Sequence, residues 1–188
     1  MKTGAIIAIV VGLALLLGGC EFVQERNKLA TEKEAVTAEW SQVDSALQYR
    51  ADLIPNLVAT VKGYAKEETT VFESLANARA ALSGAKTPQE KIDANSQITS
   101  GLNRLLVVVE NYPNLKASEN FRDLSRSLEG AENRILQGRR RYNEAVQKYN
   151  TDLSLFPANI VASMSGFQRE DAYFKTDADA RTAPKVQF

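Results

Sequence analysis

The feature of this sequence that most constrains its fold is an apolar run at its beginning. From Gly4 to Gly19 there is no charged residue, and Lys2 precedes the run. The run ends in Leu17-Gly18-Gly19-Cys20, after which the sequence becomes polar. A charge-free run of this length at an amino terminus is typical of a membrane-spanning helix or of a secretion signal. Both interpretations predict that the protein acts at a membrane.

Two modes of attachment fit the residues that precede Cys20. In the first, residues 1–20 are a lipoprotein signal, with a basic start, an apolar middle and small residues before a cysteine that carries lipid after cleavage. In the second, the run remains as a single-pass anchor helix, for which about 17–25 apolar residues are needed. Cys20 is the only cysteine of the chain, so it is not half of an internal disulfide. Basic residues lie on both sides of the run and do not decide its orientation.

The composition of the remaining chain argues against several classes of function. About 168 residues follow Cys20, enough for one domain with a core. The 23 basic residues balance 23 acidic ones, so no basic surface indicates nucleic-acid binding. The chain has no histidine, which removes the commonest general base and the commonest metal ligand. We therefore expect no enzyme activity, no cofactor, no metal and no nucleic-acid partner.

Apolar periodicity and the positions of the prolines predict an all-α fold. Apolar residues recur at steps of three and four through most of the polar part, as in amphipathic helices. Prolines, which begin or interrupt helices, separate these segments at Pro55, Pro88, Pro113 and Pro157. The expected helices are about 22–53, 55–84, 88–112 and 121–153. Four helices with short connections predict an antiparallel bundle over residues 21–157, behind the anchor or signal of residues 1–20.

Two local patterns within the bundle are especially clear. Thr87-Pro88-Gln89-Glu90 combines a capping box with a proline at the first helical position, which predicts a helix start. From Phe121 to about Leu153 the apolar residues keep a seven-residue repeat. Such a repeat predicts coiled-coil-like packing against partner helices and makes self-association plausible.

The last part of the chain, residues 158–188, shows no periodicity and is expected to be an extended tail. It ends with apolar residues at Val186 and Phe188. We regard these two as candidates for docking in a groove or on a partner protein. The alternative is a disordered end.

Several stretches of the chain together form a recognisable pattern. The longest is Arg50-Ala51-Asp52-Leu53-Ile54-Pro55-Asn56-Leu57-Val58, and the others are Trp40–Asp44, Val61–Ala65, Ala78–Ala80, Tyr112–Ala117, Asn120–Phe121, Glu132–Ile135, Arg141–Asn143, Tyr149–Asn150, Phe156–Asn159, Gly166–Phe167, Tyr173–Phe174 and Ala183–Phe188. These stretches resemble the LemA family, and the resemblance covers nearly all of the chain after about residue 33. The chain departs from the usual pattern behind the apolar run, where Arg26-Asn27 replaces the tyrosine–asparagine pair of many relatives.

The resemblance implies a bacterial, membrane-associated helical bundle with an amino-terminal anchor. The family includes a relative that takes part in building magnetosome membranes. The resemblance supplies no catalytic residue, and a cysteine at the position of Cys20 is not general to the family.

Two groups of polar residues are candidates for interaction sites. Arg50, Asp52 and Asn56 flank the predicted break at Pro55, where they form a partner-binding corner or, alternatively, cap two helix ends, with Arg50 and Asp52 paired. Asn143 and Asn150 lie seven residues apart on nearly one helix face. They fix the register of a helix seam or, alternatively, line a recognition groove.

These observations predict a helical scaffold or interaction protein anchored at the bacterial cell membrane. It would present its helices to a protein partner or to further copies of itself as a homo-oligomer. The alternative is an envelope lipoprotein, lipidated at Cys20, that serves as an adaptor or sensor.

Overall fold

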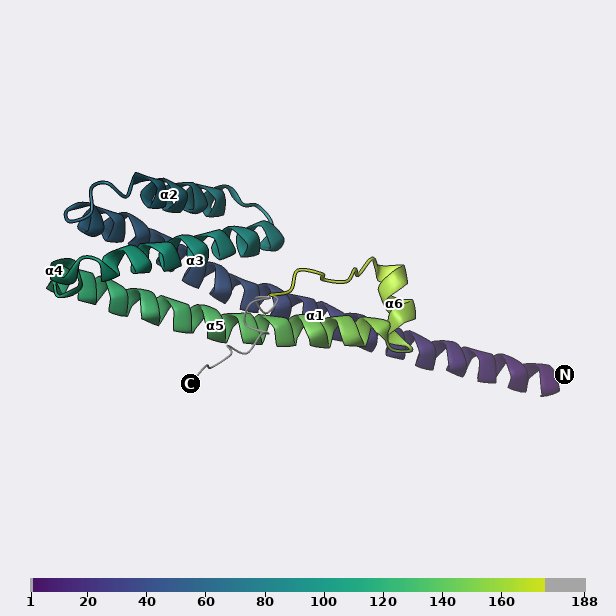
Figure 1. The fold of residues 1–188 in the computed structure, drawn as a ribbon. Coiled ribbons are helices and arrows are strands. Elements are labelled where there is room, and N and C mark those ends of the chain that lie inside the picture. Colours follow the sequence, from purple (N-terminus) through teal and green to yellow (C-terminus); the bar gives the residue numbers. More distant parts are fainter. Residues whose placement is uncertain (1, 175–188) are drawn as a thin grey trace, which may run out of the picture. The chain divides into compact units, whose positions relative to one another are not determined.

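The computed structural model describes residues 2–174, and over these residues the chain forms helices and no strand (Figure 1). The helices are α1 (Lys2–Lys62), α2 (Thr69–Gly84), α3 (Pro88–Glu110), α4 (Pro113–Lys116), α5 (Glu119–Ser154) and α6 (Ala158–Ser165). The all-α prediction is confirmed. Val186 and Phe188 lie outside the described residues.

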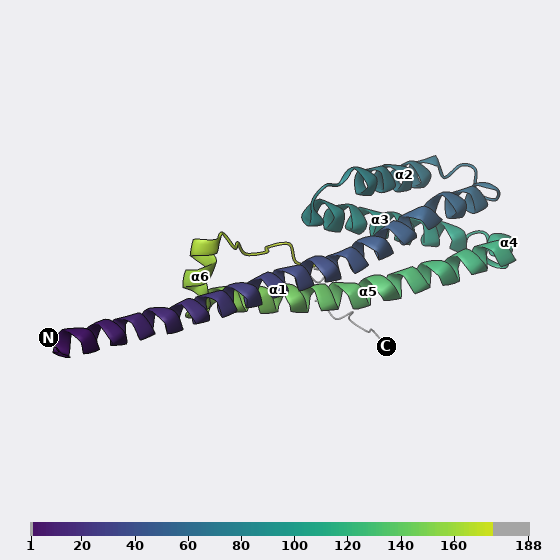
Figure 2. The same ribbon diagram turned by 180° about the vertical axis from the view of Figure 1, so that it is seen from behind.

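The chain divides into two compact units, each of which contains part of α1 and part of α5. The first unit is Met1–Glu39 with Glu144–Asp171, and the second is Trp40–Asn143 with Ala172–Phe188. In the first unit, Lys28 pairs with Asp152 and Lys33 with Glu170. In the second unit, α2 and α3 form a hairpin that both ribbon views show side by side (Figure 2).

The predicted helix break at Pro55 is wrong, because α1 continues through this residue to Lys62. A proline inside a helix leaves the carbonyl four residues earlier without its N–H partner. Here that carbonyl belongs to the buried Ala51, and it accepts a hydrogen bond of 3.2 Å from Nε of Arg79. A side chain from α2 thus replaces the missing donor and helps the helix to continue.

The segment predicted as one helix over 55–84 is instead divided by a short connection. Its first part completes α1, and its second part is α2. The N–H groups of Tyr64 and Ala65 both bond to the carbonyl of Val61 at 2.9 Å, which turns the chain after Lys62. Ala65 is buried and anchors this connection, whose other residues are largely exposed.

The predicted start of α3 is confirmed. The N–H of Glu90 donates to Oγ1 of Thr87 at 3.2 Å, and the N–H of Thr87 donates to the Glu90 carboxylate at 3.0 Å. Pro88 occupies the first turn. Backbone hydrogen bonds from Lys86 and Thr87 hold the pKa of Glu90 below its usual value.

The seven-residue repeat of α5 lies on the buried side of the helix. The residues of the repeat that are buried are Phe121, Ala131, Ile135, Tyr142, Tyr149 and Leu153. Gly138 belongs to the same side, and in the second unit it lies against Val43 of α1. Side chains at this spacing bury one continuous stripe, which explains why a helix this polar overall has a stable packing partner.

The prediction of an extended chain from residue 158 is wrong for Ala158–Ser165, which form α6. This helix has only eight residues, which is too few for apolar periodicity to predict it. Burial of Ala158, Val161 and Ala162 within the unit stabilises it. Gly166 ends it with φ of 76°, a left-handed conformation that suits glycine. Residues 167–174 have no regular secondary structure, as expected.

The single-pass anchor predicted at residues 4–20 is not supported by the structure. Along the part of the chain that the structure describes, no helix has the length and apolar character needed to cross a membrane.

Candidate functional site

The amino-terminal part of α1 presents an apolar surface. Every isoleucine, valine and leucine from Ile6 to Leu17 has more than half of its surface exposed, from 51% at Val11 to 72% at Leu15. Val23 is 54% exposed, and Cys20 is an exposed free thiol. Large apolar patches are unfavourable in water and usually mark a surface that contacts a membrane or a partner.

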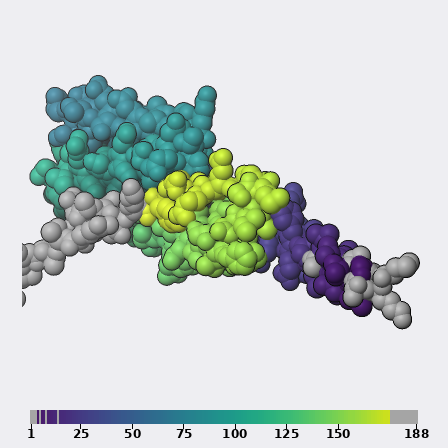
Figure 3. Space-filling model, turned by 90° about the vertical axis from the view of Figure 1, so that its right-hand side faces the viewer, coloured from purple at the N-terminus to yellow at the C-terminus, as the bar shows by residue number. Residues whose placement is uncertain are grey.

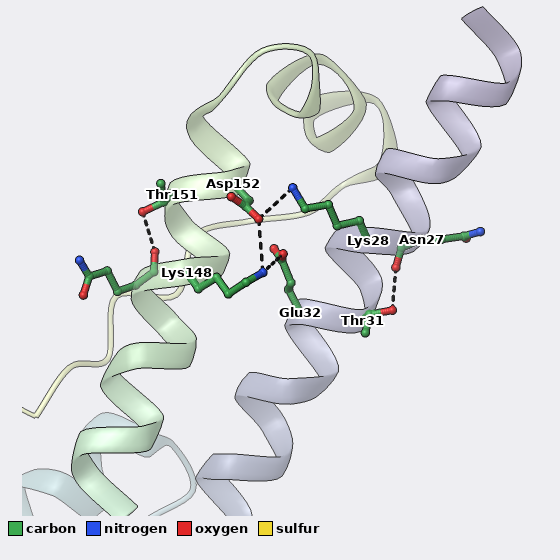
Figure 4. A network of polar contacts seen from close by, with 8 residues as sticks. Asn27, Lys28, Thr31, Glu32, Lys148, Thr151 and Asp152 are labelled. Carbon is green, nitrogen blue, oxygen red and sulfur yellow. Dashed lines mark hydrogen bonds and ion pairs between the residues drawn. The ribbon is translucent and has the colours of Figure 1, made fainter. Parts of the chain in front are cut away.

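A cluster of four charged residues joins α1 to α5 within the first unit, directly after this apolar stretch (Figure 4). This charge cluster consists of Lys28, Glu32, Lys148 and Asp152. Nζ of Lys28 lies 3.0 Å from Oδ2 of Asp152, and Nζ of Lys148 lies 3.5 Å from the same oxygen. Lys148 also pairs with Glu32. The pairs fix the register of the two antiparallel helices.

The two carboxyl groups of the charge cluster titrate differently. Burial raises the pKa of Glu32, whose side chain is 8% exposed, and a hydrogen bond to Asp152 raises it further. That bond and the bond from Lys28 hold the pKa of Asp152 below its usual value. Lys148 opposes the rise at Glu32, so the pKa values of the two carboxyl groups move apart while both stay paired with lysines.

Asn150 and Asn143 each pair with the backbone of the segment that follows α6. In the first unit, Nδ2 of Asn150 donates to the carbonyl of Glu170 at 2.7 Å, and the N–H of Glu170 donates to Oδ1 of Asn150 at 2.9 Å. In the second unit, Asn143 makes the same pair of bonds with Phe174, at 2.8 and 3.1 Å. Each amide thus offers the donor and acceptor that a neighbouring strand would offer.

Aromatic residues support the Asn143–Phe174 pairing in the second unit. The Phe174 ring lies 6.1 Å from the Trp40 ring and 6.0 Å from the Tyr142 ring, measured between centroids. The guanidinium of Arg139 lies 5.0 Å from the Phe174 ring, a cation–π geometry. The two asparagines proposed for register or recognition therefore hold a segment of their own chain.

Arg50, a predicted interaction residue, is buried in the second unit and is 2% exposed. Its guanidinium donates to Glu132 at 2.5 Å, to the Asn95 carbonyl at 3.1 Å and to Thr99 at 3.2 Å. It also bonds the side chain of Asn95, and its Nε has no hydrogen-bond partner. Burial lowers the pKa of Arg50, and the carboxylate of Glu132 opposes that shift.

The predicted pairing of Arg50 with Asp52 is wrong. Asp52 is exposed, accepts a hydrogen bond of 2.9 Å from Gln48 and lies 3.8 Å from Arg79. Asn56 is also exposed, and its backbone carbonyl accepts a bond from the Thr60 hydroxyl. Because α1 does not break at Pro55, residues 50 and 52 point to different sides of one continuous helix.

A pocket of about 320 Å³ lies beside the Arg50 network in the second unit. Its apolar lining is Leu57, Leu102, Leu106 and Leu128, and its polar lining is Arg50, Thr99, Asn103, Glu129 and Glu132. This size and mixture suit an aliphatic group that carries a hydrogen-bonding end. Over residues 2–174, no group of three or more acidic, cysteine or histidine side chains is placed to hold a metal ion.

Sequence reasoning missed the partners of Arg50. Glu132 and Asn95 are polar residues of α5 and α3, and their spacing along the chain gives no sign that they converge on Arg50. The one available signal was the number of poor helix formers in the middle of α3. Asn95 and Thr99 belong to this set and face the guanidinium.

Comparison with known proteins shows the family of the chain. Residues 39–188 match the model of the LemA family. The chain is 25% identical over 178 residues to magnetosome protein MamQ 2 of Paramagnetospirillum magneticum, covering 79% of this chain and 64% of the relative. It is 25% identical over 142 residues to protein LemA of Metamycoplasma hominis, covering 75% of this chain and 65% of that relative. The chain thus spans just under two thirds of the relatives that it matches. The protein belongs to the LemA family.

Proposed function

We propose that this protein is a helical scaffold of the bacterial envelope, held at a membrane by the amino-terminal part of α1. The observation that carries the proposal is the exposed apolar surface from Ile6 to Leu17. Burial of apolar surface contributes about 25 cal/mol per Å², so exposure of this whole stretch to water is strongly unfavourable. Residues 4–19 of α1 carry no charge and are largely apolar, so lipid is a more favourable environment for this part of the helix than water.

The proposed scaffold role is supported by the polar side chains that bind other parts of the same chain. Arg50, Asn143 and Asn150 are engaged with their own chain, in contacts that stabilise one arrangement of the helices within each unit. A fixed helical body at a membrane is suited to presenting surfaces to a partner protein or to further copies of the chain. Relatives named magnetosome proteins are compatible with a role in a cellular structure. We propose no enzymatic activity.

The alternative, a lipoprotein adaptor or sensor, is favoured by the position of Cys20. This thiol is exposed at the end of the apolar stretch. Cleavage before Cys20 would remove that stretch, and a lipid on the cysteine would then attach the protein to the membrane. Intact mass of membrane-extracted protein distinguishes the two. Loss of residues 1–19 with added lipid supports the lipoprotein, whereas an uncleaved chain supports attachment through α1.

Vesicle flotation tests the proposed attachment. The full chain with Cys20→Ser is mixed with vesicles of phosphatidylethanolamine and phosphatidylglycerol and centrifuged in a density gradient. We expect it to float, and we expect the double variant Leu13→Asp/Leu16→Asp to remain at the bottom. Val107→Asp is the matched control, because Val107 is also largely exposed but lies on α3. Flotation that Leu13→Asp/Leu16→Asp leaves unchanged would contradict the proposal.

A further inference from the structure

A second charge-free stretch lies at the end of α5 and in α6. Residues 153–168 contain no Asp, Glu, Lys or Arg, the longest such stretch after Cys20. One side of it is buried through Ala158, Val161 and Ala162. The other side exposes large apolar side chains, which are Leu155 (54%), Phe156 (80%), Ile160 (50%) and Met164 (72%). We name these four residues the α5–α6 corner.

The α5–α6 corner and the apolar part of α1 both belong to the first unit. Asp152 pairs with Lys28, and Lys148 pairs with Glu32, so α5 runs antiparallel to α1. The chain beyond Asp152 therefore heads toward the residues before Lys28. Cys20 is eight residues from Lys28, or about 12 Å along the helix. Figure 3 shows the end of α5 and α6 directly beside α1.

This placement brings two exposed apolar surfaces to the same end of the first unit. α6 buries one apolar side within the unit and exposes Ile160 and Met164 on the other, and an interfacial helix places exposed apolar side chains of this kind at the boundary of headgroups and acyl chains. Asn159, Ser163 and Ser165 of α6 add uncharged polar groups that suit the headgroup region. The corner shares the first unit with the part of α1 that the proposed function places against lipid, so a lipid surface would cover both exposed apolar regions without a further partner.

We propose that the α5–α6 corner inserts into the membrane interface as a second lipid contact beside α1. This inference rests on the proposed attachment of the protein to a membrane. Contact at two places would fix the first unit against the lipid surface instead of leaving it free on a single helix. Lipid would cover the corner in this arrangement, and packing against a second copy of the chain is the competing possibility that the experiments distinguish.

A fluorescent label placed at the corner tests this inference. Cys20 is the only cysteine, so Cys20→Ser with Met164→Cys gives one site for an environment-sensitive nitrobenzoxadiazole label. In the same background, Gln147→Cys is the matched control, because Gln147 is exposed on α5 of the same unit. On vesicles of phosphatidylethanolamine and phosphatidylglycerol, we expect a blue shift and quenching by spin-labelled lipids at residue 164. The label at residue 147 should show neither.

The outcomes separate this inference from the proposed function. If the labelled chains do not float with the vesicles, membrane attachment itself is contradicted. If they float but the label at residue 164 remains in water, attachment stands and the lipid contact of the corner is overturned. A blue shift without quenching by spin-labelled lipids also overturns it, because another protein copy would then cover the corner.

Substitution at the corner gives a second measurement that does not depend on a label. Phe156→Asn with Met164→Gln removes two exposed apolar side chains, so the helices should form as before. We expect vesicle affinity to fall about tenfold or more, given the transfer free energies of such side chains. Val107→Gln should leave it unchanged. An affinity equal to that of the parent chain would overturn the proposal.

Discussion

Arg79 donates a 3.2 Å hydrogen bond from Nε to the backbone carbonyl of Ala51. Pro55, four residues further on, has no N–H with which to satisfy this carbonyl. The bond therefore links a residue of α2 to the position in α1 where the proline leaves a carbonyl without its helical partner. It explains why a helix with an internal proline continues to Lys62.

Removing this donor should destabilise the second unit. Arg79→Met leaves a buried carbonyl without a partner, which costs about 1–3 kcal/mol. In a Pro55→Ala background, the new N–H satisfies the carbonyl, and Arg79→Met should cost about half as much or less. Urea unfolding of the four proteins measures the coupling, and Arg122→Met at an exposed position is the control. Equal costs in both backgrounds would show that Arg79 acts in some other way.

Gly138 and Gly130 of α5 should respond in opposite directions to alanine. A Cβ on Gly138 would lie 2.9 Å from Cγ2 of Val43, whereas nothing lies within 4 Å of one on Gly130. Gly130→Ala should stabilise by about 0.5–1 kcal/mol through helix propensity. Gly138→Ala should destabilise, because overpacking costs about 1–3 kcal/mol and exceeds that gain. Thermal or urea unfolding decides, and a stabilised Gly138→Ala would contradict the close approach of α1 and α5.

Hydrogen exchange should show that Asn143 and Asn150 each protect a different backbone N–H group. Asn150→Ala removes both bonds to Glu170, and Asn143→Ala removes both bonds to Phe174. With about 1 kcal/mol for each bond, protection of the affected N–H should fall by about tenfold or more. Each variant is the control for the other, since Glu170 should respond chiefly to Asn150→Ala and Phe174 to Asn143→Ala. Unchanged exchange at both amides would refute the pairings.

Stability of the first unit should depend on pH in two windows. The pKa of Glu32 is raised above its ordinary value of 4.5, so the folded state binds more protons above that pH. Its contribution is present at low pH and is lost as the pH rises through the folded-state value. The pKa of Asp152 is lowered from 3.8, so its contribution is present above 3.8 and is lost on further acidification.

Two variants isolate these contributions. As the pH rises above 4.5, Glu32→Gln should lose less stability than the parent chain. As the pH falls below 3.8, Asp152→Asn should lose less stability than the parent chain. Urea unfolding across this pH range measures both slopes. Parallel curves for parent and variants would contradict the shifted pKa values. Gln147→Ala, on the same helix but outside the charge cluster, is the control.

The sequence was sufficient for features determined by neighbours along the chain. The capping box at Thr87 and Glu90 and the buried repeat of α5 depend on short-range geometry, and both were predicted. Pro55 was misjudged because its compensation comes from Arg79, far along the chain. The partners of Arg50 and the helix α6 likewise depend on packing between distant segments, which periodicity does not report. The sequence indicated Asn143 and Asn150 as candidate interaction residues, but it did not predict that they bind the backbone of Phe174 and Glu170.

Membrane fractionation of cells tests the central claim, that the amino-terminal part of α1 holds the protein at a membrane. The measured quantity is the share of the protein that sediments with membranes after washing with high salt. We predict that the parent chain and Val107→Asp stay in the membrane fraction, while Leu13→Asp/Leu16→Asp is released. A parent chain that remains in the supernatant, or a double variant that sediments as fully as the parent, would contradict the claim.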